Sequence, residues 1–342
     1  MNQARASVPF VSVIIPVRNE SRFIEKSLRT FLDNDYPREM LEVVVVDGAS
    51  QDATADIVKT IAKEDPRVIL LHNTDRITPV SMNMGVKAAR GDMVVIVGAH
   101  SEFANDYLNS CVNALERTGA GCVGGYMETV PGGPGAIAKA ICLATTSPFG
   151  VGGAKFRTGG LEEKEVDTVA FGAFRREVFE KVGLYNTLLV RNQDMEFSTR
   201  MRKAGYKIVI SPTIKFKYYN RGTFAGLRQQ AFNNGLWNPY TSYLVGDALS
   251  VRHFVPLMFV ASLVVLATAG LAWWPAWILL GLEIALYLTA GTIMAAKAAR
   301  PAGASTVLVL LTFLQFHVAY GIGSLWGIIT APLKFGLPRK KS

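Results

Sequence analysis

Apolar positions follow two alternating periods over the first 210 residues. Short β-branched runs predict buried strands at 11–16 (VSVIIP), 41–46 (LEVVVV), 68–72 and 94–97. Helical spacing of the apolar residues predicts helices at 19–34, 53–62, 79–89, 107–117, 175–182 and 196–204, with a late strand at 207–210. Strands that alternate with helices at this spacing predict an α/β fold with a mostly parallel, doubly wound sheet.

A different pattern begins near residue 254. Between 254 and 296 the ionisable side chains are Glu283 and Tyr287, and between 305 and 332 they are His317 and Tyr320. A helix crosses the hydrocarbon core in about 20 residues, so the first stretch is too long for one crossing. We therefore predict three membrane segments, at 254–273, 276–296 and 306–331. The predicted organisation is an α/β domain at 1–220, an amphipathic interface segment at 221–253, a membrane domain at 254–333 and a basic tail at 334–342.

The first residues (MNQARASVPF) have no apolar core of signal-peptide length, so we expect the leading domain in the cytoplasm and a multi-pass protein of the inner membrane. Three crossings would then place Arg339, Lys340 and Lys341 outside, against the positive-inside bias. A last segment that re-enters or lies in the interface would remove this conflict, and Gly321, Gly323 and Gly327 would allow it to bend.

Composition changes this picture little. Half of the residues are hydrophobic, and the net charge is +9. The basic residues are dispersed, which favours anionic lipid and a phosphorylated substrate over nucleic acid as partners. The three cysteines, Cys111, Cys122 and Cys142, lack CxxC spacing and are expected to be reduced, buried thiols.

Polar residues follow several predicted strands, at the edge where open α/β sheets bind ligands. Asp47 and Asp52 follow the second strand, His100 follows the fourth, and Asp194 precedes a later helix. A carboxylate at the end of an apolar strand needs a partner. From the residues alone, helix capping is the favoured role for Asp47, Asp52 and Asp194, and a ligand-binding role is the alternative.

The order of the segments resembles the inverting family 2 glycosyltransferases, which have the GT-A nucleotide-diphospho-sugar transferase fold. The matching text is VSVIIPVRNE, VVVVDGASQDAT, MNMGVKAARGDMVVIVGAH, FGAFRREVFEKVG and NQDMEFSTRMRKAGY. The hydrophobic C-terminal segments are similar to the membrane-bound subgroup typified by the succinoglycan glucosyltransferase ExoA. The resemblance implies a hexosyltransferase that uses a nucleoside diphosphate sugar.

The resemblance also implies roles for individual residues. The donor-binding set it implies is Pro16, Asn19, Glu20, Asp47, Asn83, Arg90, Asp92 and His100. Asp194 matches the general base, which takes the proton of the acceptor hydroxyl in an inverting transfer. Gln193 stands where the family usually has Glu, Glu196 stands where a second carboxylate often follows, and both are expected on the acceptor side.

The position of His100 is unusual for this family. An Asp-x-Asp segment usually binds a divalent cation here, and this chain has Gly98-Ala99-His100. One interpretation makes His100 a ligand of Mn²⁺ or Mg²⁺, of which Mn²⁺ suits imidazole better. A second has His100 and nearby basic residues neutralise the leaving diphosphate directly. A third makes His100 a turn residue.

The segment before the first hydrophobic run contains Trp237 without the Gln-x-x-Arg-Trp motif of many processive relatives. Trp237 is expected on the acceptor side, in an interface helix, or in both roles. The resulting hypothesis is transfer of a single hexose to a polyprenyl-diphosphate-linked saccharide. The alternatives are a polyprenyl-phosphate monosaccharide synthase and a catalytically weak scaffold subunit.

Overall fold

The computed structural model describes residues 8–246, 249 and 251–336. The tail residues Arg339, Lys340 and Lys341 therefore lie outside the described part. The strands are β1 (Val11–Val17), β2 (Leu41–Asp47), β3 (Val68–His72), β4 (Met93–Ile96), β5 (Ser101–Phe103), β6 (Cys122–Val130), β7 (Lys164–Glu165), β8 (Ala173–Arg175) and β9 (Ile208–Tyr219). The helices of the first part are α1 (Ile24–Leu32), η1 (Arg38–Met40), α2 (Thr54–Glu64), α3 (Thr78–Ala88), α4 (Tyr107–Thr118), α8 (Arg176–Val182) and α9 (Gln193–Lys203).

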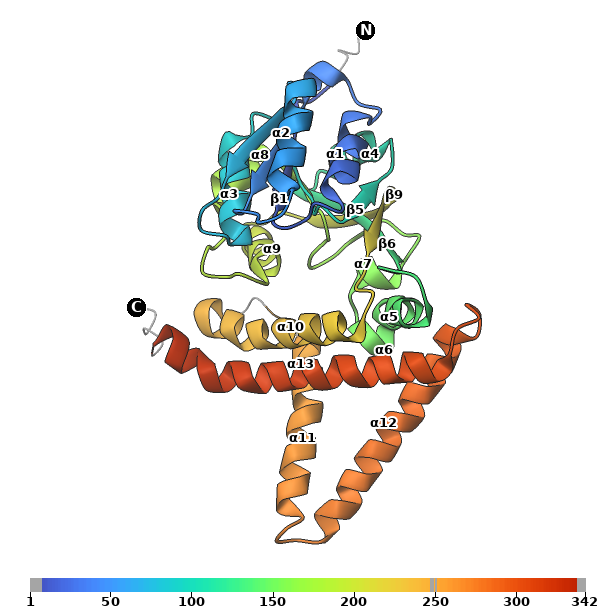
Figure 1. The fold of residues 1–342 in the computed structure, drawn as a ribbon. Helices are drawn as coiled ribbons and strands as arrows, with labels where there is room; N and C mark the ends of the chain where they lie inside the picture. Colours follow the sequence, from blue (N-terminus) through green and yellow to red (C-terminus); the bar gives the residue numbers. More distant parts are fainter. Residues whose placement is uncertain (1–7, 247–248, 250, 337–342) are drawn as a thin grey trace. The chain divides into compact units, whose positions relative to one another are not determined.

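The remaining helices are α5 (Ala136–Thr146), α6 (Pro148–Val151), α7 (Lys155–Thr158), α10 (Phe224–Val245), η2 (Val251–Phe254), α11 (Val255–Ala269), α12 (Pro275–Ala299) and α13 (Thr306–Phe335). The chain divides into two compact units (Figure 1). Unit 1 comprises Met1–Glu128 and Gly159–Tyr218, and unit 2 comprises Thr129–Thr158 and Tyr219–Ser342. Residues 129–158, which we assigned to the first domain, therefore belong with the C-terminal helices.

Unit 1 is built on a sheet with the strand order β3-β2-β1-β4-β8-β6-β9-β5, with β7 beside β9. Strands β3, β2, β1 and β4 are parallel. Strand β8 joins β4 in the antiparallel direction, and β5 and β7 pair with β9 in the same way. The α/β fold class is confirmed, and the antiparallel half adds to it.

The predicted elements of unit 1 match the structure closely where the apolar period is strong. Strand β3 has the predicted bounds, and β2 is buried along its whole length because helices cover both faces of a parallel sheet. No helix or strand is predicted between 119 and 160. The chain forms β6 and α5 there. Strand β9 is 12 residues long and extends beyond its predicted end at 210. Its second half alternates buried and exposed positions, whereas the predicted part is a continuous apolar run.

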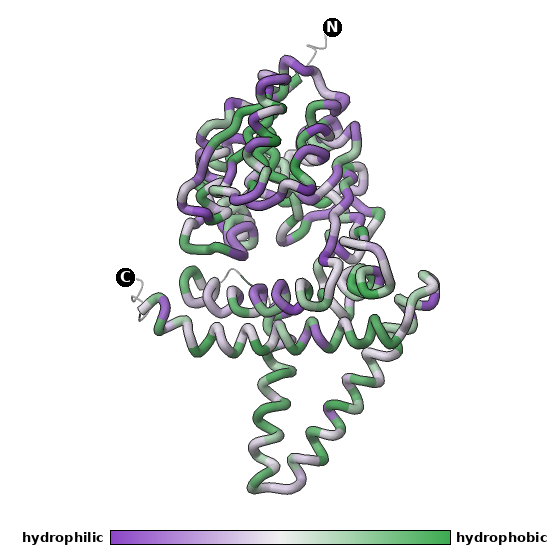
Figure 2. The backbone as a smooth tube through the Cα atoms, viewed as in Figure 1, coloured by the Kyte–Doolittle hydropathy of each residue, from purple (hydrophilic) through white to green (hydrophobic). Residues whose placement is uncertain are grey.

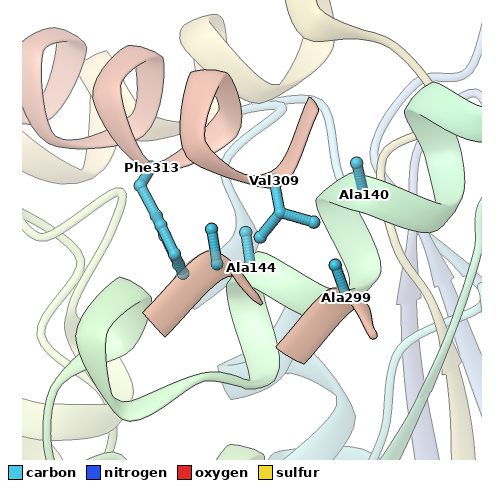
Figure 3. Close-up of a cluster of buried hydrophobic side chains, with 6 residues drawn as sticks. Ala140, Ala144, Ala299, Val309 and Phe313 are labelled. Atoms are coloured by element: carbon cyan, nitrogen blue, oxygen red, sulfur yellow. The ribbon is translucent and has the colours of Figure 1, made fainter. Parts of the chain in front are cut away.

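Unit 2 is helical in the part that the structure describes. A small core joins α5, α12 and α13 through Ala140, Ala144, Ala295, Ala299, Val309 and Phe313 (Figure 3). Helices α11 and α12 form a hairpin, in which the Ser262 hydroxyl donates to Glu283 Oε1 at 2.5 Å. Three helices in the described range are long and apolar enough to cross a membrane, at Val251–Ala269, Pro275–Ala299 and Thr306–Phe335.

The cysteines behave as free thiols. Cys111 and Cys122 are buried and Cys142 is half-buried, and none of the three forms a disulfide. Burial raises the pKa of each thiol, to about 11 for Cys142. A thiol with a raised pKa carries little thiolate, so these cysteines contribute packing and not nucleophilic chemistry.

Candidate active site

The loops that follow β1, β2 and β4 form one edge of the parallel half-sheet, called here the carboxyl edge. The first two loops are joined through Asn19, which adopts a left-handed backbone with φ of 55°. The Asn19 amide N–H donates to Ser50 Oγ at 2.9 Å, and Asn19 Oδ1 accepts from the Gln51 N–H at 2.8 Å. Asn19 thus shapes the edge beside Pro16, which lies in β1 opposite Val46.

Asp47 is the last residue of β2 and only 3% exposed. Its Oδ2 accepts from the Ser50 N–H at 3.2 Å and lies 3.9 Å from His72 Nδ1. Its Oδ1 is buried, with no hydrogen-bond partner among the described residues. A buried polar oxygen without a partner is costly, so Asp47 has an unused acceptor that suits a ligand N–H.

Asp52 has the capping role that the sequence also allowed. Its two oxygens accept from the Thr54 and Ser21 N–H groups at 3.0 and 3.1 Å. The hydrogen bond from the Thr54 hydroxyl is the first cause that lowers the pKa of this carboxyl. Asp52 is therefore occupied within the protein, in contrast to Asp47.

His100 lies in the loop between β4 and β5, where it approaches Glu20 from the loop after β1. His100 Nδ1 is 3.4 Å from Glu20 Oε1, and both side chains are about one-quarter exposed, at 26% and 25%. The imidazole also packs against Tyr218 of β9, with ring centroids 5.1 Å apart. A carboxylate next to one ring nitrogen orients a histidine so that its other nitrogen can face a ligand or a metal.

The same loop explains why the usual first carboxylate is absent. A Cβ atom at Gly98 would lie 3.1 Å from Cε1 of Phe171, whose ring packs over this position. A side chain here would require that ring to shift by a few tenths of an ångström. Gly98 thus leaves space for the ring of Phe171, which lies just before β8.

A divalent cation fits this loop only as an ion shared with a ligand. In the described ranges, no group of three His, Cys, Asp or Glu side chains is placed to hold a metal. His100 and Glu20 offer one nitrogen and one carboxylate. The remaining ligands would have to be diphosphate oxygens and water, which Mn²⁺ and Mg²⁺ both accept.

Helix α9 presents Asp194 and Glu196 from its first turn, and the two carboxylates have opposite environments. Glu196 is buried and accepts from Arg200 Nε at 2.6 Å and Nη2 at 2.9 Å. Arg200 also donates to the Val182 and Leu184 carbonyls at 2.6 and 2.7 Å. Glu196, expected on the acceptor side, therefore holds α9 against the end of α8.

Asp194 is exposed, and no ion pair to it occurs among the residues that the structure describes. Desolvation by surrounding protein nevertheless raises the pKa of its carboxyl, opposed by hydrogen bonds from the Met195 and Asp194 N–H groups. We therefore regard Asp194 as accessible, with a basicity above that of an ordinary aspartate.

Other predicted donor residues have structural partners. The Asn83 side-chain amide exchanges two hydrogen bonds with the Tyr185 backbone, at 2.8 and 2.9 Å. Arg90 Nε donates to Glu42 Oε2 at 2.8 Å, and Asp92 accepts from the Phe10 N–H at 3.2 Å. Arg90 and Asp92 lie where β2 and β4 begin, at the end of the sheet opposite Asp47, so the structure does not bring them to the carboxyl edge.

The remaining acceptor-side candidates lie in different units. Gln193 begins α9 beside Asp194, and its Oε1 is buried without a hydrogen-bond partner in the described part of unit 1. Trp237 lies in α10 of unit 2, 8% exposed, under the ammonium group of Lys334 at 5.1 Å from the ring centroid. Its surroundings are those of a packing residue.

Sequence reasoning missed two residues beside His100. Tyr218 comes next to it because Ser101 of β5 pairs with Tyr218 of β9. Ser101 itself is buried, and its hydroxyl has no hydrogen-bond partner among the described residues. The alternation of apolar and polar residues over 208–219 was a signal for a longer strand, and that strand would have brought Tyr218 to this loop.

Comparisons with known proteins identify the family of this chain. Residues 12–183 match the model of the family described as Glycosyl transferase family 2. The chain is 31% identical to "Succinoglycan biosynthesis protein ExoA" of Rhizobium meliloti over 91% of this chain and 92% of the relative. It is also 31% identical to the "Dolichyl N-acetyl-alpha-D-glucosaminyl phosphate 3-beta-D-2,3-diacetamido-2,3-dideoxy-beta-D-glucuronosyltransferase" of Methanococcus voltae, over 66% of this chain and 72% of that one.

Among solved structures, the mannosyltransferase PcManGT from Pyrobaculum calidifontis, in complex with GDP-Man and Mn²⁺, is similar in fold. It has a TM-score of 0.64 and 24% identity, with 94% of this chain and 88% of that chain covered. The fold likeness supports the GT-A architecture, and the family match includes Asp47 at the end of β2 and His100 in the loop after β4. The chain therefore belongs to glycosyl transferase family 2 and is a glycosyltransferase that resembles ExoA.

Proposed function

We propose that this glycosyltransferase moves one hexose, with inversion, from a nucleoside diphosphate sugar to a lipid-linked saccharide at the cytoplasmic face of the inner membrane. The observation that carries the proposal is the contrast within α9. Glu196 is committed to Arg200, whereas Asp194 is exposed and has a raised pKa. A relative named for succinoglycan biosynthesis and another named for a dolichyl-linked substrate support a lipid-linked acceptor.

In this mechanism Asp194 takes the proton of the acceptor hydroxyl. The acceptor oxygen forms a bond to the anomeric carbon from the face opposite the diphosphate. The bond from that carbon to the diphosphate oxygen breaks, and the nucleoside diphosphate leaves with the electron pair. A second carboxylate is not needed, because no covalent sugar intermediate forms.

Asp47 would recognise the donor at the carboxyl edge, through the buried Oδ1 that has no protein partner in the described chain. This oxygen suits an imide or amino N–H of the nucleotide base. Asn19 would keep the two flanking loops in place, as its hydrogen bonds to Ser50 and Gln51 indicate.

A divalent cation would be held by His100, with Glu20 orienting the ring or sharing the ion. When bound, such a cation neutralises the charge that develops on the leaving diphosphate. His100→Ala should raise the Mn²⁺ concentration needed for half-maximal activity at least tenfold. Full activity of the wild type in excess chelator would contradict this role.

The test of the proposal is Asp194→Asn in the full-length protein, assayed with a panel of sugar nucleotides and lipid-linked acceptors. We expect transfer to fall by about 10²- to 10⁴-fold, the range of general base catalysis, while donor binding is retained. Asp56→Asn is the matched control, because Asp56 is an exposed aspartate in the first turn of α2. Retained turnover in Asp194→Asn would refute the assignment.

The pH profile gives a second readout of the same residue. The base must be ionised, and its pKa is raised by desolvation. Activity should therefore fall with decreasing pH at a higher pH than an ordinary aspartate would give. An acid limb below that of an ordinary aspartate would contradict the role.

Product formed with polyprenyl phosphate alone as acceptor would favour the monosaccharide synthase over our proposal.

A further inference from the structure

Unit 2 contains three helices that could cross a membrane, but their packing differs. The most apolar window of α13 is 28% buried, whereas those of the two hairpin segments are 6% and 11% buried. At a rise of 1.5 Å per residue, the 30 residues of α13 extend about 45 Å, well beyond a hydrocarbon core of about 30 Å. Figure 1 shows α13 running alongside α10 and across the open end of the α11–α12 hairpin.

Helix α13 is joined to α10 along most of its length. Hydrogen bonds link Arg228 Nη1 to Gln315 at 2.6 Å, Ser324 Oγ to the Gly235 carbonyl at 3.1 Å, and Tyr240 to Thr330 at 2.7 Å. The partners advance together along both helices, so the two helices are parallel and side by side.

Glycines allow the two backbones to approach closely. A Cβ atom at Gly323 would lie 2.2 Å from the Phe232 carbonyl oxygen, and one at Gly327 would lie 2.6 Å from that of Leu236. On α10, a Cβ at Gly235 would lie 1.9 Å from the Tyr320 oxygen. Small residues at such spacing are typical of close helix pairs. Because the contact involves backbone on both sides, α13 and α10 must take the same position relative to the membrane.

Helix α10 is too polar to cross. Its 22 residues include Arg228, Gln229, Gln230, Asn233 and Asn234, and Figure 2 shows hydrophilic segments along it, in contrast to the mostly green and pale hairpin. Polar and charged side chains at bilayer depth are strongly unfavourable unless they face a protein interior. Since α10 does not cross, its partner α13 does not cross either.

The outer face of α13 nevertheless needs an apolar partner. Exposed apolar side chains recur along it at helical spacing, at Val307, Leu311, Ile322, Trp326, Ile329 and Leu333. The hairpin meets the helix beside this stripe, because a Cβ at Gly321 would lie 2.4 Å from the Pro256 carbonyl at the start of α11. Gly291, near the end of α12, faces Leu310.

We propose that the protein crosses the bilayer only twice, through the α11–α12 hairpin, and that α13 lies in the membrane interface with this stripe in the lipid. The exposed Lys297 and Arg300 at the end of α12 and Lys334 at the end of α13 then lie at headgroup level, where anionic lipid attracts them. The chain ends, with Arg339, Lys340 and Lys341, on the same side as unit 1. The predicted third crossing is thereby removed, and so is the conflict with the positive-inside bias.

The proposal can be tested in cells with the full chain and a membrane-impermeant maleimide. Three variants, each with one added cysteine, report the hairpin turn (Ala272→Cys), unit 1 (Glu64→Cys) and the C-terminus (Ser342→Cys), and the unaltered chain gives the background of its native thiols. We expect Glu64→Cys and Ser342→Cys to react under the same condition, intact or permeabilised, and Ala272→Cys under the other. Labelling of Ser342→Cys together with Ala272→Cys would overturn the proposal, and so would identical labelling of all three.

A lysine pair gives an independent measurement. Val265 in α11 and Ile322 in α13 are both exposed aliphatic residues, at 61% and 47%. Val265→Lys should reduce the membrane-integrated protein severalfold, because the ammonium lies within the core. Ile322→Lys should keep it within about twofold of the wild type, because the lysine can reach the headgroups. Equal effects of the two lysines would contradict an interfacial α13. Neither experiment depends on the proposed transferase reaction.

Discussion

Strand β2 carries a buried carboxylate near each of its ends, and the two differ in their partners. Glu42, near the start of β2, is 1% exposed and accepts from Ser12 Oγ at 2.6 Å, the Arg90 N–H at 2.7 Å and Arg90 Nε at 2.8 Å. Asp47, at the end, is 3% exposed and retains an oxygen without a partner in the described chain. The same chemical group thus closes one end of the sheet and leaves the other end able to bind a ligand.

The hydrogen bonds also determine the charge state of Glu42. Burial alone would raise the pKa of this carboxyl, but the hydrogen bonds from Ser12 and Arg90 outweigh it and lower the pKa. A carboxyl whose pKa is lower in the folded state stabilises the protein above its unfolded pKa of about 4.3. That contribution is lost as the pH falls from there through the folded pKa.

The largest effect on stability is expected for Glu42→Gln. The amide group replaces an acceptor by a donor and leaves buried donors without partners, so the free energy of unfolding should fall by about 2–4 kcal/mol. Thermal unfolding in detergent measures the loss, and its acid dependence below pH ~4.3 should diminish. Donor affinity should stay within about twofold, because Glu42 lies at the other end of β2 from Asp47. A large loss of donor affinity with unchanged stability would reverse the comparison.

The contrast within β2 also shows what sequence can and cannot provide. The β-branched run of β2 predicts a buried strand, and the rule that ligands bind at the carboxyl ends of strands places Asp47 at the site. Neither identifies the partner of Asn83, because tertiary packing brings Tyr185 to it from 102 residues away. The pairing of Glu196 with Arg200 is different, since the two residues are four apart in one helix and this spacing is visible in the sequence. The positions of Arg90 and Asp92 could have been predicted, since they precede β4 and the amino ends of parallel strands lie away from the site.

The sequence does not predict β6 and α5 between 119 and 160 for a different reason. Its glycines indicate loops on local propensity, but Gly124 and Gly125 lie in β6, where neighbouring groups leave no room for side chains. A Cβ at Gly125 would lie 2.0 Å from the Ile214 carbonyl oxygen. Close packing between distant segments therefore required the glycines, and a single sequence does not show that requirement.

Asp47→Asn should have a smaller effect than Glu42→Gln, and the effect should be on donor binding and not on folding. The substitution removes a charged acceptor from the carboxyl edge, where a hydrogen bond to a charged group is worth about 1.5–3 kcal/mol. Affinity for the nucleoside diphosphate should fall about tenfold to a hundredfold, as measured by calorimetry. The free energy of unfolding should change by less than about 1 kcal/mol, because one oxygen has no protein partner. Unchanged affinity would remove Asp47 from the donor site.

The smallest effect is expected for His72→Gln, which removes the imidazole next to the Asp47 carboxylate. His72 Nδ1 lies 3.9 Å from Asp47 Oδ2, and the imidazole is 58% exposed. Exposed pairs at such distances contribute less than about 0.5 kcal/mol, so donor affinity should change less than about threefold and stability hardly at all. Glutamine keeps a polar side chain of similar reach, so packing is disturbed little. A loss as large as that of Asp47→Asn would mean that His72 contacts the donor itself, and the binding surface at this edge would then extend from β2 to the end of β3.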